Sequence, residues 1–318
     1  MVTGRSSPLV RWSYMDHWRA DTPRGPVTQY HSRRQMDDFV KQISAVGFEG
    51  LDMFDFQVFA LGEMFGSPEA YLRYLQDHGI AKIVNLFRGI MYDHRVADPH
   101  VPDTHGEIVE STRRMLGMWA SLDIEGLIVM PGSLYIDTAP VTDDKIAAAA
   151  ECWSRVGEMT LEEFGVRTTG HHEFFCSLRT EADILKFYEL SDPRYVGFFC
   201  DTAQHCIAGI DPVALYERLH ERCTGFHFKD TRERDVTEAY RHRPDAELMA
   251  PQTDRWFYEM GTEGGLVDFP SLMEAHRRHG FAGWITVEHD KANIGGDYAE
   301  STALAMWYAR RVLGEVGP

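Results

Sequence analysis

Acidic and histidine side chains follow four successive apolar runs in the C-terminal half of the chain. These runs end as GHHEFF, FFCDTAQH, FHFKD and ITVEHD, and they supply Glu173, Asp201, His227 and Glu288. Buried charges are costly unless they are paired or bind a metal. Three carboxylates and one imidazole suit Mn²⁺, Mg²⁺ or Co²⁺ better than a zinc site rich in thiolates. We therefore expect these four residues to bind one divalent cation, with Mn²⁺ as the expected ion.

Two further residues stand in the same register. Side chains two apart on a strand share a face, so His171 is expected beside Glu173 and Lys229 beside His227. An imidazole has a reference pKa close to neutrality, which makes His171 the expected general base. His172 is an alternative. Taken singly, an aspartate after a strand is often a helix cap and a histidine is often a hydrogen-bonded structural group. Their succession on four strands favours the shared site.

Two residues near the N-terminus could contact a substrate. Trp12 lies in the first apolar run, and its ring could stack on a sugar. Asp52 ends the second run and could accept a hydrogen bond from a sugar hydroxyl, although a capping or turn role is equally consistent with its position.

The elements that must position these side chains alternate regularly along the chain. Short runs rich in apolar, β-branched or aromatic residues are typical of buried parallel strands. Gly47, Gly79, Gly165 and Gly280 each close a segment with helical periodicity. The expected strands are residues 9–14, 49–54, 81–87, 125–130, 166–171, 195–200, 224–228 and 283–287. The expected helices include residues 107–122, 141–164, 181–190, 212–222, 269–279 and 298–313.

Eight strands, each followed by a helix, predict an α/β fold, a (β/α)₈ TIM barrel, with a doubly wound sheet as the alternative. No linker divides the chain, so we expect residues 1–318 to form one domain. A polar stretch at about 231–262, with Trp256, Phe257 and Tyr258 near its end, interrupts the pattern after the seventh strand. Long loops in compact domains are often lids or binding loops, so we expect a lid-like insertion rather than a decorated surface loop.

Composition narrows the classes of partner. The net charge of −17 repels phosphate backbones and anionic lipid, so we expect no nucleic-acid or membrane partner. Five cysteines without a C-x-x-C pair argue against a disulfide framework and favour a reducing cytoplasm. No stretch reaches the 18 or so apolar residues of a membrane span. We expect a cytoplasmic enzyme that acts on a small molecule.

Several motifs resemble a known superfamily. DTAQHCIAGIDP, GFHFKDT, GTEGGLVDFPSL and GWITVEHD look like the sugar-phosphate isomerase/epimerase superfamily, with its xylose-isomerase-like barrel. SDPRYVGFFCDTAQHCIAGIDP most resembles the inosose dehydratase branch, and GFEGLDMF resembles its second strand. The resemblance implies a divalent metal held by Glu, Asp, His and Glu, and a substrate contact for Lys229. The family often has a histidine where this chain has Gln204, with His205 one residue further on. Both residues are expected to bind substrate, and His205 is another alternative base.

A narrower resemblance is to the larger subunits of bacterial C-glycoside deglycosidases. It implies action on a 3-keto glycoside and a small β-sandwich partner subunit. We therefore expect a metal-dependent lyase that cleaves a keto-sugar through an enolate and releases an aglycone. An inosose dehydratase or a ketose 3-epimerase or isomerase is the alternative, because all of these reactions use one metal and one base. Two other classes are an abasic-site endonuclease, which the negative charge disfavours, and a non-catalytic sugar-binding module.

Overall fold

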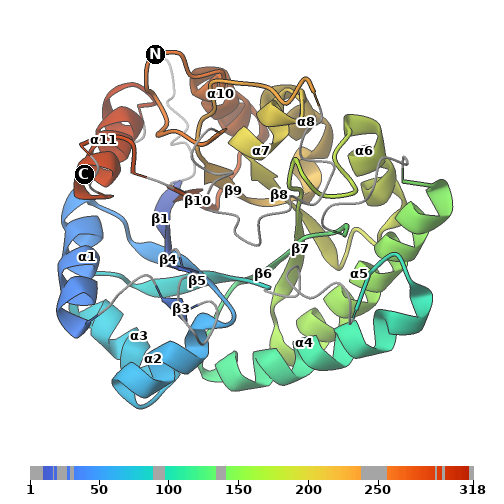
Figure 1. Ribbon diagram of the computed structural model, residues 1–318, viewed down its shortest axis with the longest axis horizontal. Helices are drawn as coiled ribbons and strands as arrows, with labels where there is room; N and C mark the ends of the chain where they lie inside the picture. Colours follow the sequence, from blue (N-terminus) through green and yellow to red (C-terminus); the bar gives the residue numbers. More distant parts are fainter. Residues whose placement is uncertain are drawn as a thin grey trace, which may run out of the picture.

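Eight parallel strands close into a barrel, and the helices surround it (Figure 1). The computed structural model describes residues 10–16, 18–19, 27–28, 32–88, 97–133, 141–237, 256–290, 292–295 and 298–314. The strand order around the barrel is β1-β10-β9-β8-β7-β6-β5-β4, so each strand pairs with its neighbours in the sequence and the last strand pairs with the first. The predicted TIM barrel is confirmed.

Every predicted strand overlaps one barrel strand. The first differs most, because it begins and ends two residues later than expected. The strands are β1 (Arg11–Asp16), β4 (Gly50–Phe54), β5 (Lys82–Phe87), β6 (Gly126–Val129), β7 (Arg167–His171), β8 (Val196–Asp201), β9 (Cys223–Phe228) and β10 (Trp284–Val287). A separate antiparallel pair, β2 (Trp18–Arg19) and β3 (Val27–Thr28), was not expected.

One or more helices follow each barrel strand. Two of them, α2 and the short α7, were not expected from the sequence. The α-helices are α1 (Arg33–Val46), α2 (Gln57–Phe65), α3 (Pro68–Asp77), α4 (His105–Trp119), α5 (Asp143–Phe164), α6 (Glu181–Leu190), α7 (Thr202–Ile207), α8 (Pro212–Leu219), α10 (Phe269–His279) and α11 (Tyr298–Arg311). Short 3₁₀ turns span Pro102–Thr104, Ala120–Leu122 and His220–Arg222.

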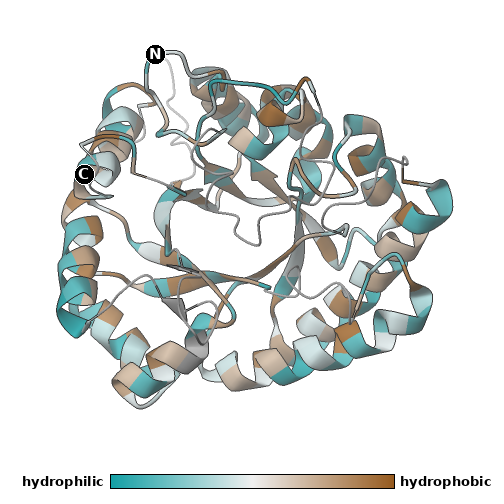
Figure 2. Cartoon of the chain, in the orientation of Figure 1, coloured by the Kyte–Doolittle hydropathy of each residue, from teal (hydrophilic) through white to brown (hydrophobic). Residues whose placement is uncertain are grey.

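Helix α1 shows how the sequence defines such an element. The Ser32 hydroxyl caps its first turn by accepting from the Gln35 N–H. Gly47 ends it in the left-handed conformation, with φ of 106°. Its apolar residues recur at helical spacing and are buried against the barrel, while polar residues cover the outside (Figure 2). The buried residues are Met36, Phe39, Val40 and Ile43.

Helix α5 approaches the barrel too closely for a side chain at Gly157. A Cβ atom there would lie 2.5 Å from the Tyr195 carbonyl oxygen, just before β8. Gly117 in α4 is different, because a Cβ atom there would meet nothing within 4 Å. Gly157 is therefore needed for close packing, whereas packing does not require a glycine at position 117.

The stretch after β9 is fastened at both ends. Asp230 and Tyr258 form an isolated antiparallel bridge, with backbone N–H···O distances of 2.8 and 2.9 Å. The buried Asp230 Oδ1 also accepts from the N–H groups of Thr231, Leu266 and Val267 at 2.8–3.1 Å. Residues 238–255 of the expected insertion lie outside the described residues, so its role as a lid stays a prediction.

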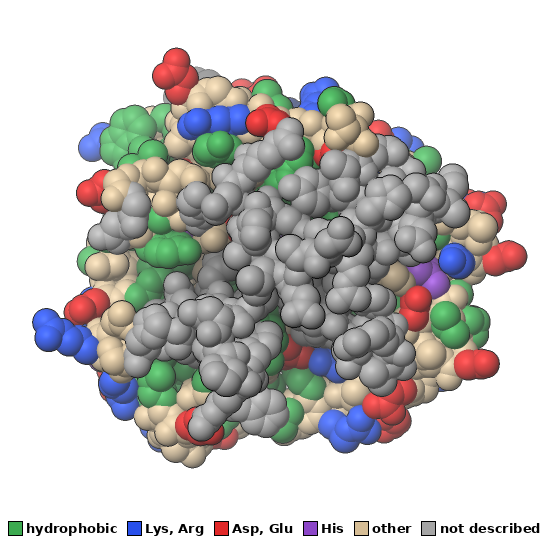
Figure 3. Space-filling view, viewed as in Figure 1, with side chains coloured by type: hydrophobic (Ala, Val, Ile, Leu, Met, Phe, Trp, Pro, Cys, Tyr) green, Lys and Arg blue, Asp and Glu red, His purple; other side chains and the backbone are tan. Residues whose placement is uncertain are grey.

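Three general features concern the surface and the chain as a whole. Figure 3 shows the face seen in Figure 1, with acidic and basic side chains spread around its rim. In the part of the chain that the structure describes, no helix is long and apolar enough to cross a membrane. All five cysteines are free thiols.

Candidate functional site

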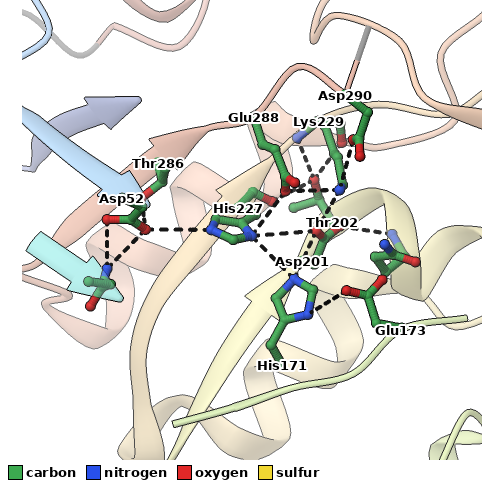
Figure 4. Close-up of polar contacts among 12 residues, drawn as sticks. Asp52, His171, Glu173, Asp201, Thr202, His227, Lys229, Thr286, Glu288 and Asp290 are labelled. Atoms are coloured by element: carbon green, nitrogen blue, oxygen red, sulfur yellow. Dashed lines mark hydrogen bonds and ion pairs between the residues drawn. The ribbon is translucent and has the colours of Figure 1, made fainter. Parts of the chain in front are cut away.

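Four buried side chains converge at the carboxyl ends of four adjacent strands (Figure 4). His171 and Asp201 are the last residues of β7 and β8, His227 lies near the end of β9, and Glu288 directly follows β10. One potential ligand atom from each lies within 4.8 Å of the others. We call these residues the metal-binding group. Asp201, His227 and Glu288 were expected in it from the sequence.

The fourth member is His171, and Glu173 lies beside it. The His171 Nε2 atom faces the group at 3.1 Å from Asp201 Oδ2, while its Nδ1 atom lies 3.3 Å from Glu173 Oε1. The reason lies in where the strand ends. Strand β7 stops at His171, so Glu173 lies in the following loop, outside the ring of strand ends. The other Glu173 oxygen, Oε2, is buried and has no hydrogen-bond partner among the described residues.

His227 lies at the centre of the contacts. Its Nδ1 atom is 3.0 Å from Glu288 Oε2 and 3.2 Å from His171 Nε2. Its Nε2 atom points the other way, 3.5 Å from Asp52 Oδ2. The ring itself is completely buried, with Phe199 packed on it at a centroid distance of 4.7 Å. His227 therefore presents one nitrogen to the group and the other to a carboxylate behind it.

Lys229 supplies a fixed positive charge at this site. Its Nζ atom lies 2.9 Å from Glu288 Oε2, 3.2 Å from Asp201 Oδ2 and 3.0 Å from Asp290 Oδ2. The ammonium also lies 4.2 Å from the centroid of the Phe257 ring, a cation–π distance. The side chain is only 2% exposed. This arrangement keeps a fixed cation within reach of the same carboxylates that could hold a metal.

Burial and charge act in opposite directions on the pKa values of the group. Burial alone would lower the pKa of His227, but Glu288 and Asp52 outweigh it and raise that pKa to about 10. His171 behaves likewise, because Glu173 and Asp201 raise its pKa against the effect of burial. Burial would raise the pKa of Asp201, but Lys229 and His171 lower it. The Asp201 carboxylate is thus held in its charged form.

Asp290 is a residue that the sequence reasoning missed. Burial raises its pKa to about 7, although Lys229 opposes that shift. A signal was present, because Asp290 lies two residues after Glu288 and closes the same ITVEHD motif. Asn85 and Thr286 were also missed, since neither type of side chain stands out at a strand position without its partners.

Several predicted site residues are not members of the metal-binding group. Asp52 is completely buried within the barrel, where it accepts hydrogen bonds instead of facing the mouth. Trp12 precedes the inward-facing Ser13, so it points outward, and its ring packs edge-on against Phe228. Gln204 Oε1 accepts from the Phe174 N–H at 3.1 Å and is 3% exposed. Its expected substrate contact stays a prediction.

The two alternative bases lie behind the strands. The His172 ring packs edge-on against Phe187 and Tyr188 of α6, and burial lowers its pKa well below the usual value. The His205 ring stacks on Phe198, and burial lowers its pKa to about 4. Both rings therefore belong to the layer between the barrel and α6, on the far side of the strands from Asp201.

Aromatic side chains from the end of the insertion pack beside the group. Phe174, which directly follows Glu173, contacts Trp256 and Phe257 at centroid distances of 5.5 and 6.3 Å. Phe257 also covers the Lys229 ammonium. All three rings are less than 5% exposed. The end of the insertion is thus part of the wall of the site.

The donor set fits a divalent cation. Two imidazole nitrogens and two carboxylates are the ligands that first-row divalent metals bind, and all four residues are buried. Buried carboxylates at this density need a positive partner, and Lys229 provides one charge for Asp201, Glu288 and Asp290 together. The expected set had three carboxylates and one imidazole, whereas this group has two of each. The second imidazole makes the site more suitable for Zn²⁺, Fe²⁺ or Co²⁺.

The sequence matches the family described as the xylose isomerase-like TIM barrel over residues 40–309. An inosose dehydratase of Lacticaseibacillus casei is 29% identical over 168 residues, which is 53% of this chain and 54% of that protein. The rhizopine catabolism protein MocC of Rhizobium meliloti is 34% identical over 131 residues, covering 41% of this chain and 39% of that protein. The match with the inosose dehydratase thus spans about half the length of that relative.

Solved structures share the whole fold at low sequence identity. An L-ribulose 3-epimerase superposes with a TM-score of 0.69 and 14% identity, covering 96% of this chain and 95% of that one. The IolI protein, solved with a binding zinc atom, gives 0.69 and 15%, covering 96% and 99%. A probable 3-DHS dehydratase, AsbF of Bacillus anthracis, gives 0.65 and 14%, covering 95% and 100%. These likenesses establish the architecture of this chain.

Proposed function

The chain belongs to the xylose isomerase-like TIM barrel family, and from this premise we propose that it is a divalent-metal-dependent lyase. Its substrate is a cyclic keto-sugar or keto-polyol that loses an α-proton and then a group β to the ketone. The observation that carries this proposal is the buried group of two histidines and two carboxylates, with Glu173 and Lys229 beside it.

His171, Asp201, His227 and Glu288 would hold the metal. When bound, the ion supplies a Lewis acid beside the ketone oxygen, which makes the neighbouring C–H bond acidic. The zinc atom in the IolI structure supports a metal site in this barrel, and the inosose dehydratase relatives support a dehydration.

Glu173 is the residue that we assign to proton abstraction. One of its oxygens faces His171, and the other is buried and accepts no hydrogen bond from a described residue. That second oxygen is the group available to take a proton. The expected roles of His171 and Glu173 are thereby exchanged: the histidine binds the metal, and the glutamate acts as the base.

Lys229 would stabilise the negative charge that develops on the substrate after proton abstraction. The carboxylates around it raise its pKa well above the usual value, so the side chain stays protonated at neutral pH. A protonated amine beside the site can stabilise negative charge on substrate oxygen and can hydrogen-bond a departing hydroxyl group. The base and the fixed cation thus lie beside the same metal-binding group, as a β-elimination requires.

The direct test is turnover of 2-keto-inositol by protein loaded with Mn²⁺, Co²⁺ or Zn²⁺. Dehydration, detected as ultraviolet absorbance of the conjugated product, is the expected result. Solvent deuterium exchange at the α-carbon without dehydration would show that the half-reaction occurs and that the leaving step is wrong. The absence of both exchange and turnover with all three metals would reject the proposal.

A second candidate is cleavage of a 3-keto C-glycoside, with release of an aromatic aglycone. It is favoured by the contact of Phe174 with Trp256 and Phe257, which brings the end of the insertion to the site. A partner would then be a small β-sandwich subunit. Incubation of the metal-loaded protein with a 3-keto C-aryl glycoside, with and without such a subunit, separates this candidate from the inosose reaction.

A further inference from the structure

A buried carboxylate lies behind the His227 ring, on the side away from the metal-binding group. Asp52, in the middle of β4, has no exposed surface, and its Oδ2 atom is 3.5 Å from His227 Nε2, an ion-pair contact that does not meet hydrogen-bond geometry. The opposite ring nitrogen, Nδ1, is 3.0 Å from Glu288 Oε2. Figure 4 shows the ring between the two carboxylates. Asp52 therefore contacts a candidate ligand but is not itself in the group.

Asp52 is held in place by donors from neighbouring strands. Asn85 Nδ2 donates to both of its oxygens, at 2.9 and 3.0 Å. Thr286 Oγ1 donates to Oδ2 at 2.8 Å. Because Thr286 uses its proton on Asp52, Ser13 must donate to Thr286 across their 2.8 Å contact. Four strands of the barrel, β1, β4, β5 and β10, thus fix one carboxylate.

We infer that Asp52 is a positioning residue that holds His227 with its proton on Nε2, so that Nδ1 offers a lone pair to the metal. In the other tautomer the Nε2 lone pair would face a carboxylate oxygen, which is repulsive. A carboxylate that accepts from the second nitrogen of a ligating histidine fixes the orientation of the ring and raises its basicity. This inference rests on the metal dependence in the proposed function.

The position of Asp52 argues against a direct role in substrate binding. With no exposed surface, and with Asn85 and Thr286 packed against its oxygens, it offers no atom that a sugar hydroxyl could reach. Its effect on substrate must pass through His227. That distinction separates a positioning residue from a substrate ligand in experiment.

The test is Asp52→Asn, because an amide of the same shape cannot satisfy these contacts. An NH₂ group at the Oδ1 position would face the Asn85 donor, and at the Oδ2 position it would face His227 Nε2 and favour the wrong tautomer. We expect the Kd for Co²⁺, titrated directly without substrate, to rise roughly 10–100-fold. The visible spectrum of bound Co²⁺ should change, because one ligand is less well held.

Two further variants and one spectrum keep the test decisive. Thr286→Val leaves the carboxylate in place but removes one donor, so we expect a smaller loss of Co²⁺ affinity. Asp55→Asn is the matched control, since Asp55 is a buried aspartate that directly follows the same strand and pairs with Arg88 at 2.6 Å. It should leave Co²⁺ binding unchanged. Long-range ¹⁵N spectra of histidine-labelled, Zn²⁺-loaded wild type should show His227 protonated at Nε2.

The outcomes distinguish this inference from the proposed function. If the wild type binds no stoichiometric metal, the proposed function fails. If the wild type binds Co²⁺ and folded Asp52→Asn binds it equally well with the same spectrum, only the role of Asp52 is overturned. A wild-type His227 protonated at Nδ1 in the loaded protein would overturn it as well, even if Asp52→Asn does not fold.

Discussion

His171 and Glu173 are close enough that their roles can be separated only by substituting each in turn. We expect His171→Ala to lower metal affinity at least tenfold, because it removes a ligand atom that lies 3.1 Å from Asp201. Glu173→Gln should retain one metal ion per chain but lose about 10²–10⁴-fold in kcat, because it removes the base. Metal analysis and steady-state kinetics on both variants check this. The reverse pattern would restore Glu173 as ligand and His171 as base.

The pH dependence of metal binding follows from the two histidines. In the metal-free protein the neighbouring carboxylates raise the pKa of both rings, that of His227 to about 10, so His227 is protonated near neutrality and His171 keeps its proton to a higher pH than a free imidazole does. A metal must displace these protons. Metal affinity should therefore rise with pH, up to about tenfold per unit for each proton displaced. Titrations with Co²⁺ at pH 6, 7 and 8 measure the slope, and a Kd independent of pH would contradict it.

The sequence predicts which strand ends carry the site but not the finer division of roles. Asp201, His227 and Glu288 each follow an apolar run directly, and they come together as expected. The predicted strand 166–171 ends at His171, as β7 does, so the sequence places Glu173 just beyond the strand. It does not reveal which of the two side chains faces Asp201, because that contact joins residues 30 positions apart. The partners of Asp52 are equally hidden, since Asn85 and Thr286 are distant in sequence.

Among the helices, α5 packs so closely against the chain before β8 that a larger side chain at Gly157 does not fit. We expect Gly157→Ala to destabilise the protein by about 1–3 kcal/mol, because the new Cβ atom overlaps the Tyr195 carbonyl oxygen. Gly117→Ala is the matched control in another helix, where space is free. It should stabilise by about 0.5–1 kcal/mol through helix propensity. Urea unfolding of both variants measures the contrast, and equal effects would refute this account of α5.

A buried histidine in α10 makes stability sensitive to acid. Burial lowers the pKa of His276 to about 3, and neither ring nitrogen has a hydrogen-bond partner among the described residues. Because the unfolded chain takes up the proton near pH 6.5 and the folded one does not, stability falls as the pH drops below 6.5.

Replacing this side chain tests that sign. Relative to the wild type, His276→Leu should gain about 2 kcal/mol of stability between pH 7 and pH 5, because the variant has no group to protonate there. The leucine would keep the apolar contact with Phe226, whose ring centroid is 4.2 Å from that of His276. Urea unfolding at both pH values provides the comparison. A difference between the two proteins that does not change with pH would show that His276 titrates normally.

Element boundaries show where sequence reasoning succeeds and stops. The barrel strands are predicted because buried parallel strands are continuous apolar runs, and GLIV of β6 is an example. Helix α7 is missed because it has only six residues, all buried, and therefore no amphipathic periodicity. The pair β2 and β3 is missed because each strand has two residues, too few for any alternation to be visible.

For the whole molecule, the proposed metal would join strands that are separate in the sequence. Its ligands would come from β7, β8, β9 and the residue after β10, so binding should stabilise the folded state by about 2.7 kcal/mol at a hundredfold excess over Kd. We expect EDTA to lower the melting temperature by several degrees and to abolish turnover, and added metal to restore both. Asp201→Asn should show no such response. An unchanged melting temperature after verified metal removal would contradict this.

The backbone bridge between Asp230 and Tyr258 affects how ligand preference can change among proteins with this barrel. The intervening chain departs and returns at paired residues, and the Asp230 carboxylate secures both sides of that junction. A segment anchored in this way can be exchanged as a cassette, because the entropy of joining its ends depends only weakly on its length. New ligand preferences could therefore arise by transplanting residues 238–255 between homologues, while Phe257 over Lys229 and the catalytic framework stay the same.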